Sequence, residues 1–215
     1  HAPDVDGTAI IPGRLGGGHG GSLGNGETAH GGSPAHVTSF FNLPGAGIGR
    51  NSSSNAGGGG HGGLGTWSTS THGKTYGTRD LAHLFAGSGG GGGSHRSGGS
   101  GGGGLRITSG GTLTIGANVM ADGGRGGAKG TSSNQSGAGG SGGAIYLKAE
   151  HLVINQGVIV RAAGGAGATG VLGASTGGGG RIHLEGTSSI TNHQSPVWAN
   201  VTAKGGNSLG NTRHG

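Results

Sequence analysis

The sequence predicts an all-β fold, a parallel β-solenoid-like stack of ~40-residue repeats whose connecting segments resemble polyglycine II. Three observations support this prediction. Segments with alternating apolar residues recur along the chain, their spacing is constant, and 63 of the 215 residues are glycine. Because only 28% of the residues are hydrophobic and 3% aromatic, one conventional core would not offset the backbone entropy that ordered glycines lose.

The repeat is clearest in the second half of the chain. The segments "VMADGG", "VRAAGG" and "VTAKGG" end at Gly124, Gly165 and Gly206, which are 41 residues apart. Each follows an alternating segment: "LRITSGGTLTIGANV", "AIYLKAEHLVINQGVIV" or "RIHLEGTSSITNHQSPVWANV". Alternation with period two indicates a strand that buries one face, and such units bury that face by stacking. The third copy has a more polar middle, as expected of a terminal, capping repeat.

This pattern divides the chain into four parts. Residues 1–56 form an N-terminal glycine-rich segment with a weak repeat, and residues 57–104 lead into the stack. Residues 105–206 are the three-copy β-repeat region, and residues 207–215 are a C-terminal tail. Helix formers are scarce, so Asp80–Phe85 ("DLAHLF") is the best candidate for a single helical turn. The predicted core consists of Leu105, Ile107, Leu113, Ile115, Val119, Ile145, Leu147, Leu152, Ile154, Val158, Val160, Ile182, Leu184, Val197, Ala199 and Val201.

The glycines also recur in threes within their tracts. Gly164, Gly167, Gly170 and Gly173 are each three residues apart. An extended polyproline-II helix has three residues per turn, so such glycines share one edge, along which a neighbouring backbone can approach closely. We therefore predict packed connectors in which these four glycines line the contact and Ala168 faces outward. The alternative is a flexible tether.

Composition excludes several classes of protein. The net charge of +6 is spread over single residues, which disfavours nucleic-acid binding. No cysteine is present, so neither disulfides nor thiolate-bound metals are expected. No apolar run reaches the length of a transmembrane segment. The chain starts at His1 without a signal peptide, as a mature secreted fragment or a piece of a longer protein would. We expect an extracellular or cell-surface location.

No residue pattern predicts catalysis, and we expect neither an enzyme nor a cofactor. The "GGSGG" around Ser141 matches a nucleophile-elbow pattern that glycine-rich chains produce by chance. Gly73-Lys74-Thr75 resembles the end of a phosphate loop, but Ser68 stands where that loop needs glycine.

Three further sets of polar residues have both a functional and an ordinary interpretation. Asp122 and Glu150 could face a common groove, as the two carboxylates of a glycosidase do, or could be ordinary solvated residues. A stack that placed His19 over His61 could bind zinc or copper, although surface histidines are the simpler interpretation and we predict no metal site. Three sequons, at Asn51, Asn134 and Asn200, would carry glycans in a eukaryotic secreted protein.

The order of motifs resembles a family of large glycine-rich β-helical repeat proteins of cell surfaces and extracellular matrix. That family's pattern places glycine tracts between "AIRL…SGTLTV…GTISANGG", "GGSIYL" and "GGGGRIAL". Here "GGGGLRITSGGTLTIGANVMADGG", "GGSGGAIYLKAEHLVINQGVIVRAAGG" and "GGGGRIHLEG" follow in the same order. The resemblance covers about residues 57–206 and implies a surface protein without an established catalytic site. A looser similarity is to glycine-rich phage tail-tip adhesins.

Two classes of function follow from these observations. The first is a structural protein that self-associates into a surface filament, sheath or matrix, because a solenoid has open ends. The second is a binding module, either an adhesin for glycans or another receptor, or an ice binder. Thr108, Thr112 and Thr114 could form the flat row of small polar side chains that the second class requires.

Overall fold

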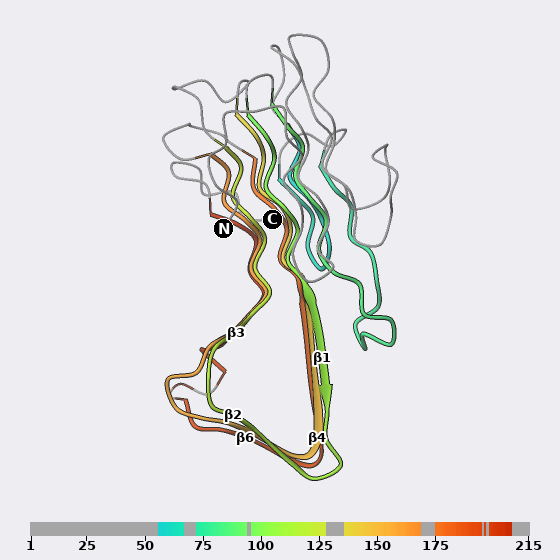
Figure 1. Ribbon diagram of the computed structural model, residues 1–215, viewed down its shortest axis with the longest axis vertical. Coiled ribbons are helices and arrows are strands. Elements are labelled where there is room, and N and C mark those ends of the chain that lie inside the picture. The colour runs from blue at the N-terminus through green and yellow to red at the C-terminus, as the bar shows by residue number, and fades with distance from the viewer. Residues whose placement is uncertain are drawn as a thin grey trace.

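The computed structural model describes residues 56–66, 72–93, 96–127, 136–168, 175–194, 196 and 198–207. These residues form strands, turns and extended segments, and they contain no helix, so the all-β prediction is confirmed for them. It follows that no membrane-spanning helix lies within these ranges. Figure 1 shows two parts along the long axis: labelled strands at one end and extended, glycine-rich segments toward the other.

The helical turn predicted at Asp80–Phe85 is wrong. Residues 79–80 form a turn, and Leu81 adopts a left-handed conformation with φ 50°. The carboxylate of Asp80 accepts hydrogen bonds from the Thr78 hydroxyl and from the Ala82 N–H. These local side-chain bonds satisfy the backbone in a turn and so compete with helix formation.

Seven strands lie within the described residues, and all their pairings are parallel. Strand β4 pairs along one edge with both β1 and β2, and along its other edge with β6. Strand β5 pairs with β3 and β7 in a second, smaller sheet. The strands are β1 (Gly104–Thr108), β2 (Thr112–Ile115), β3 (Val119–Met120), β4 (Ala144–Ile154), β5 (Val160–Arg161), β6 (Arg181–Asn192) and β7 (Val201–Thr202).

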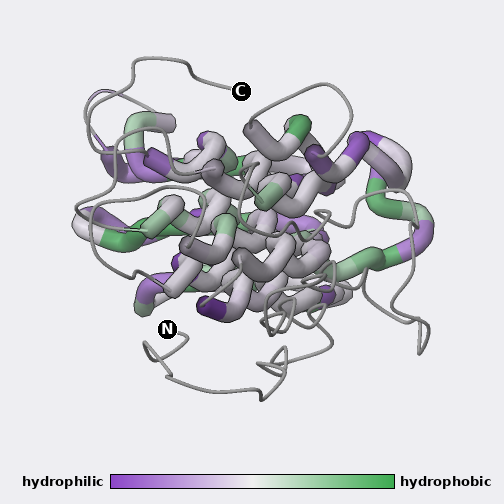
Figure 2. The backbone as a smooth tube through the Cα atoms, turned by 90° about the horizontal axis from the view of Figure 1, so that it is seen from above, coloured by the Kyte–Doolittle hydropathy of each residue, from purple (hydrophilic) through white to green (hydrophobic). Residues whose placement is uncertain are grey.

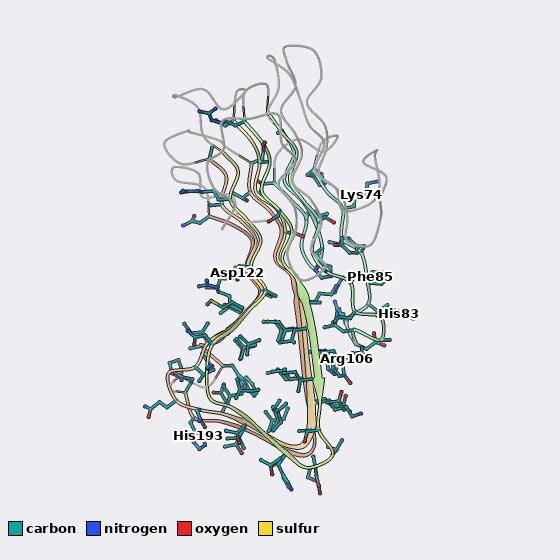
Figure 3. All side chains as sticks on the ribbon, in the orientation of Figure 1. Lys74, His83, Phe85, Arg106, Asp122 and His193 are labelled. Carbon is teal, nitrogen blue, oxygen red and sulfur yellow. The ribbon has the colours of Figure 1, made fainter. Side chains whose placement is uncertain are left out.

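The pairing places three chain segments in three layers: β1–β3, then β4–β5, then β6–β7. Residues at equivalent positions of the repeat align in columns, for example Leu105 with Ile145 and Ile182. Apolar side chains of the middle layer are fully buried, including Ile145, Leu152 and Ile154. Figure 3 shows side chains filling the space that the strands enclose. The core therefore lies between the layers and along their inner face.

Most of the predicted core is confirmed, with corrections at Leu105 and Ala199. Leu105 is 37% exposed because it lies in the first layer and is covered on one side only. Ala199 is exposed in a turn closed by its N–H and the Pro196 carbonyl. Val197 lies outside the described residues. The confirmed members are Ile107, Leu113, Ile115, Val119, Ile145, Leu147, Leu152, Ile154, Val158, Val160, Ile182, Leu184 and Val201, with Ala121, Ala149 and Ala162 in addition.

The glycine-rich segments pack directly against one another through their backbones. In segment 136–143, the N–H groups of residues 137, 140 and 143 donate to segment 121–127. Those of residues 138 and 141 donate to segment 86–93, and those of 139 and 142 donate to segment 175–180. Every third residue therefore bonds to the same neighbour, as the predicted spacing of three requires. Viewed from above, these segments form a pale central bundle with more strongly coloured residues around it (Figure 2).

The close approach of the segments excludes side chains at many positions. A Cβ added to Gly137, Gly140 or Gly143 would lie less than 3.0 Å from a carbonyl oxygen of segment 97–103. Layers are equally close, because a Cβ on Gly165 would collide with Gly124 and a Cβ on Gly206 with Gly165. The 41-residue repeat thus places glycine at successive contacts between layers.

The prediction of a single packed edge needs correction. Gly164 contacts a neighbour as predicted, but Gly165, which lies off the predicted row, is packed as tightly. Ala168, predicted to face outward, is only 3% exposed. The reason is that a segment inside a bundle has neighbours on all sides, so each of its three edges is in contact. Gly170 and Gly173 lie outside the described residues.

Substituting Gly140 by alanine should destabilise the fold strongly, because the new methyl group meets backbone atoms that cannot rotate away. We expect a loss of more than about 3 kcal/mol in the free energy of unfolding, measured by thermal melts. Gly111→Ala is the matched control, since its Cβ meets nothing within 4 Å. Equal melting temperatures for the two variants would contradict the packing of this segment.

Truncating the middle layer should cost more than truncating an outer one. Ile154 is fully buried, so Ile154→Ala should lower the free energy of unfolding by about 2–5 kcal/mol. Leu105→Ala, at a position that is 37% exposed, should cost clearly less. Chemical denaturation of both variants measures the difference, and a larger loss at Leu105 would show that the layer assignment is wrong.

Candidate functional site

The two carboxylates considered for catalysis do not form a pair. Asp122 accepts hydrogen bonds from the Arg161 guanidinium, at 2.5 Å for the shortest, and from the Ala163 N–H at 2.9 Å. Glu150 is half exposed and lies 3.8 Å from the His151 ring. Each acid therefore has its own partner, and hydrogen bonding to Asp122 raises the pKa of Arg161. This arrangement stabilises an ion pair and offers no acid–base couple.

Asp122 and Arg161 border an open groove of about 660 Å³ at the waist between strands and glycine segments (Figure 3). The groove is also lined by residues 123–125 and 163–166, which are mostly glycine and alanine. The guanidinium and the carboxylate in it neutralise each other, so the groove presents little net charge beyond Arg125. It offers a recess between the first two layers.

The other sequence matches to catalytic motifs have structural roles or no supporting context. Ser141 is fully buried, and its hydroxyl accepts a hydrogen bond from the Ser88 N–H at 2.8 Å. It joins two glycine segments and is closed to substrate. Lys74 and Thr75 lie exposed in an extended segment, with no helix in the described residues that follow. The phosphate-loop interpretation is therefore not supported.

His61 is the most unusual titratable group in the described structure. Its ring is fully buried, stacks on Tyr76 with 4.7 Å between centroids, and its Nδ1 lies 3.0 Å from the Gly142 carbonyl. A carbonyl can only accept, so Nδ1 carries the proton and Nε2 is left with a lone pair that has no partner. Burial lowers the pKa of His61 to about 4 and raises that of Tyr76 to about 12.

His61 does not belong to a metal site in the part of the chain that is described. No group of three or more histidine, cysteine, aspartate or glutamate side chains gathers there. His19, its expected partner, lies outside the described residues. The imidazole instead fills space beside the bundle, where Arg181 donates to the carbonyls of Tyr76 and Gly77 and anchors the same segment.

A polar ladder lies on the outer face of the larger sheet. The Arg106 guanidinium sits 4.5 Å from the Tyr146 ring centroid, and the Tyr146 ring stacks on His183 at 5.0 Å. These three residues occupy the same position in successive layers. In the neighbouring column, Lys148 forms an ion pair with Glu185 at 2.8 Å, which lowers the pKa of Glu185 and raises that of Lys148.

This ladder is not among the features predicted from the sequence, although the sequence contains the pattern that produces it. Aligning "LRIT", "IYLK" and "IHLE" by their apolar residues places Arg106, Tyr146 and His183 at one position. The ladder anchors a loop as well, because Arg106 donates to the carbonyls of Leu81 and Ala82. Its side chains pair with one another, so its evident role is to hold layers and loop together.

The structure also bears on the predicted glycosylation sites and on the predicted row of threonines. Asn200 is buried, and its Nδ2 donates to the Val158 carbonyl at 2.6 Å, so a glycan at that nitrogen is incompatible with the fold. Asn51 and Asn134 lie outside the described residues. Among the threonines, Thr112 and Thr114 share β2, whereas Thr108 lies in β1 beyond a turn. The three do not form one straight row.

The remaining candidate for a functional site is the exposed edge of each of the two outer layers. In the described chain, β1–β3 pair only with the middle layer, and so do β6 and β7. Leu105 in the first layer and Ile190 in the third are each 37% exposed, although their middle-layer partners Ile145 and Leu152 are fully buried. The middle of the third layer is polar as expected, with Thr187–Ser189 and Thr191 exposed, but Ile190 among them leaves the Leu152 column with an exposed apolar end. Each outer layer therefore presents an exposed apolar side chain at the end of a column.

Comparisons with protein-family models, with curated proteins and with solved structures find no match to this chain.

The free energy of unfolding should fall in acid because His61 is buried in its neutral form. Its pKa is lowered in the folded state, so protonation below the ordinary value of 6.5 favours unfolding, and the loss is complete below pH 4. The shift corresponds to roughly 3 kcal/mol lost between these pH values. Denaturant melts at pH 7, 5.5 and 4 measure it. His61→Gln keeps a donor for Gly142 without titrating, and the same acid loss in that variant would exclude His61 as its source.

Proposed function

We propose that this protein is a non-catalytic structural protein of the cell surface or extracellular matrix, whose copies stack end to end into a filament, sheath or array. The proposal includes a finer description of the fold: a short parallel β-solenoid of three turns joined to a bundle of polyglycine-II-like segments. The in-register pairing of the three layers and the period of three in the glycine contacts support that description.

One observation carries the proposal: two apolar columns that are fully buried in the middle layer, at Ile145 and Leu152, each have one end that is 37% exposed, at Leu105 in the first layer and at Ile190 in the third. Each column would gain burial if another layer were added, as a solenoid does at its ends. An open sheet edge offers backbone N–H and C=O groups to a further strand. A second copy supplies a matching edge, because the third layer of one copy and the first layer of the next would follow each other as adjacent layers of the repeat do.

The glycine bundle suits a structural role that requires stiffness. Its segments are tied by backbone hydrogen bonds in three directions, as segment 136–143 illustrates. Close packing leaves little room for backbone rearrangement, so the bundle is stiff. An adhesin or an ice binder is the alternative, but the outer face that we describe carries paired charges and no flat threonine array. We therefore favour the structural role.

Purified protein should form fibres that electron microscopy detects, with a mass that rises with concentration in sedimentation velocity. Ile190→Asp should weaken assembly by more than tenfold in critical concentration, because stacking would bury a carboxylate at the end of an apolar column (roughly 2 kcal/mol or more). The change is made at the exposed edge, and melting temperatures establish that the variant is folded.

Thr191→Asp is the matched control. Thr191 is the next residue of the same edge strand, and it is exposed on the opposite, outer face. An aspartate there stays hydrated in the stack, so assembly should be close to that of the unsubstituted protein. Equal effects of the two substitutions would argue against burial of the column end, and a protein that stays monomeric at all concentrations would refute the proposed function.

A further inference from the structure

Building on the proposed end-to-end assembly, we infer that copies join in the register that relates the three layers, so that Lys204 of one copy pairs with Asp122 of the next. The assembly is then directional, or head to tail: the third layer of each copy always meets the first layer of its neighbour. The partner of this surface is a second copy of the same chain.

The repeat register places these two residues in one column. Met120, Arg161 and Thr202 are aligned partners in β3, β5 and β7. Two residues further on, the column consists of Asp122, Ala163 and Lys204. Hydrogen bonds continue the alignment there, from the Gly123 N–H to the Ala163 carbonyl and from the Gly164 N–H to the Lys204 carbonyl. If the column continued into another copy, the residue after Lys204 would be Asp122.

The same fold already makes this type of contact between its own layers. Lys148 in the middle layer and Glu185 in the third are aligned partners, and their side chains form an ion pair of 2.8 Å. A lysine and an acid in one column of adjacent layers therefore meet at ordinary strand spacing. Lys204 and Asp122 would have the same relation across the junction.

Both side chains are available for the contact. Lys204 is exposed and has no ion-pair partner among the described residues. Asp122 is held at the waist by Arg161, with its side chain 26% exposed. Its Oδ2 accepts only from Arg161, whereas Oδ1 also accepts from the Ala163 N–H. A carboxylate oxygen in that position can accept a further hydrogen bond from a lysine.

The opposite signs also select the direction of stacking. A two-fold junction of third layer with third layer that is centred on this column would bring two Lys204 side chains together, and the corresponding junction of first with first would bring two Asp122 side chains together. Like charges placed opposite each other destabilise strand pairing. Parallel strands impose the same choice, because only the third-to-first junction continues the strand direction of the layers.

Charge reversal in two separate variants tests the inference. Lys204→Glu should raise the critical concentration for assembly about fivefold or more, because it places an acid opposite Asp122 of the next copy. Asp122→Lys should do the same with two lysines. Mixed in equal amounts, the two variants should co-assemble nearly as well as the unsubstituted protein, since every junction again joins opposite charges. Sedimentation velocity and fibre length in electron micrographs are the readouts.

The controls separate this inference from the proposed function. Lys74→Glu makes the same change in net charge at an exposed residue of a glycine segment and should leave assembly unchanged. Melting temperatures check folding, and Lys204→Gln replaces Lys204→Glu if the latter unfolds. Assembly that is indifferent to Lys204→Glu, or a mixture no better than its components, would overturn the charge pairing while leaving end-to-end assembly standing. Absence of assembly in the unsubstituted protein would overturn both.

Discussion

Direct contact between backbones is the constraint on which the rest of this structure depends. Segments of the bundle approach so closely that a Cβ on Gly140 would overlap the backbone of Ser100. At this distance each segment exchanges backbone hydrogen bonds with several neighbours instead of with water. Glycine loses more conformational entropy on ordering than any other residue, so this number of bonds is what makes an ordered glycine tract stable. The high glycine content is therefore a packing requirement.

The strands and the bundle depend on each other through continuous hydrogen bonding. Along the path from β3, the N–H groups of residues 119, 121 and 123 bond to the next layer at intervals of two residues. The next N–H that bonds to this layer is that of residue 126, at an interval of three. The chain thus changes from a two-residue to a three-residue period without leaving its neighbour in the middle layer. The strands set the register of the layers, and the glycine segments that continue from them keep the same register.

This continuity explains why so small an apolar core can suffice. In the described residues, the main apolar cluster lies at the strand-lined end, where the middle layer buries Ile145, Leu147 and Leu152 completely. In the bundle, backbone hydrogen bonds take the place of an apolar core. Buried side chains such as His61 pack against its margin. In the described residues, each layer repeats the one before, and the first and third layers pair only with the middle one. Assembly of copies through these two layers is the functional consequence that we propose.

The sequence by itself determined the period-two strands, the 41-residue spacing and the positions where glycine recurs, because these are local patterns of residue type. It predicted Ile154 and Val160 in the core correctly for that reason. Tertiary structure alone decided what surrounds each residue. Leu105 is exposed because it belongs to an outer layer, and Ala168 is buried because its segment has neighbours on every side. The separation of Asp122 from Glu150, the burial of His61 and the column of Arg106, Tyr146 and His183 likewise depend on which layers are adjacent. Adjacency is set by contacts between distant parts of the chain, and a local pattern carries no record of them.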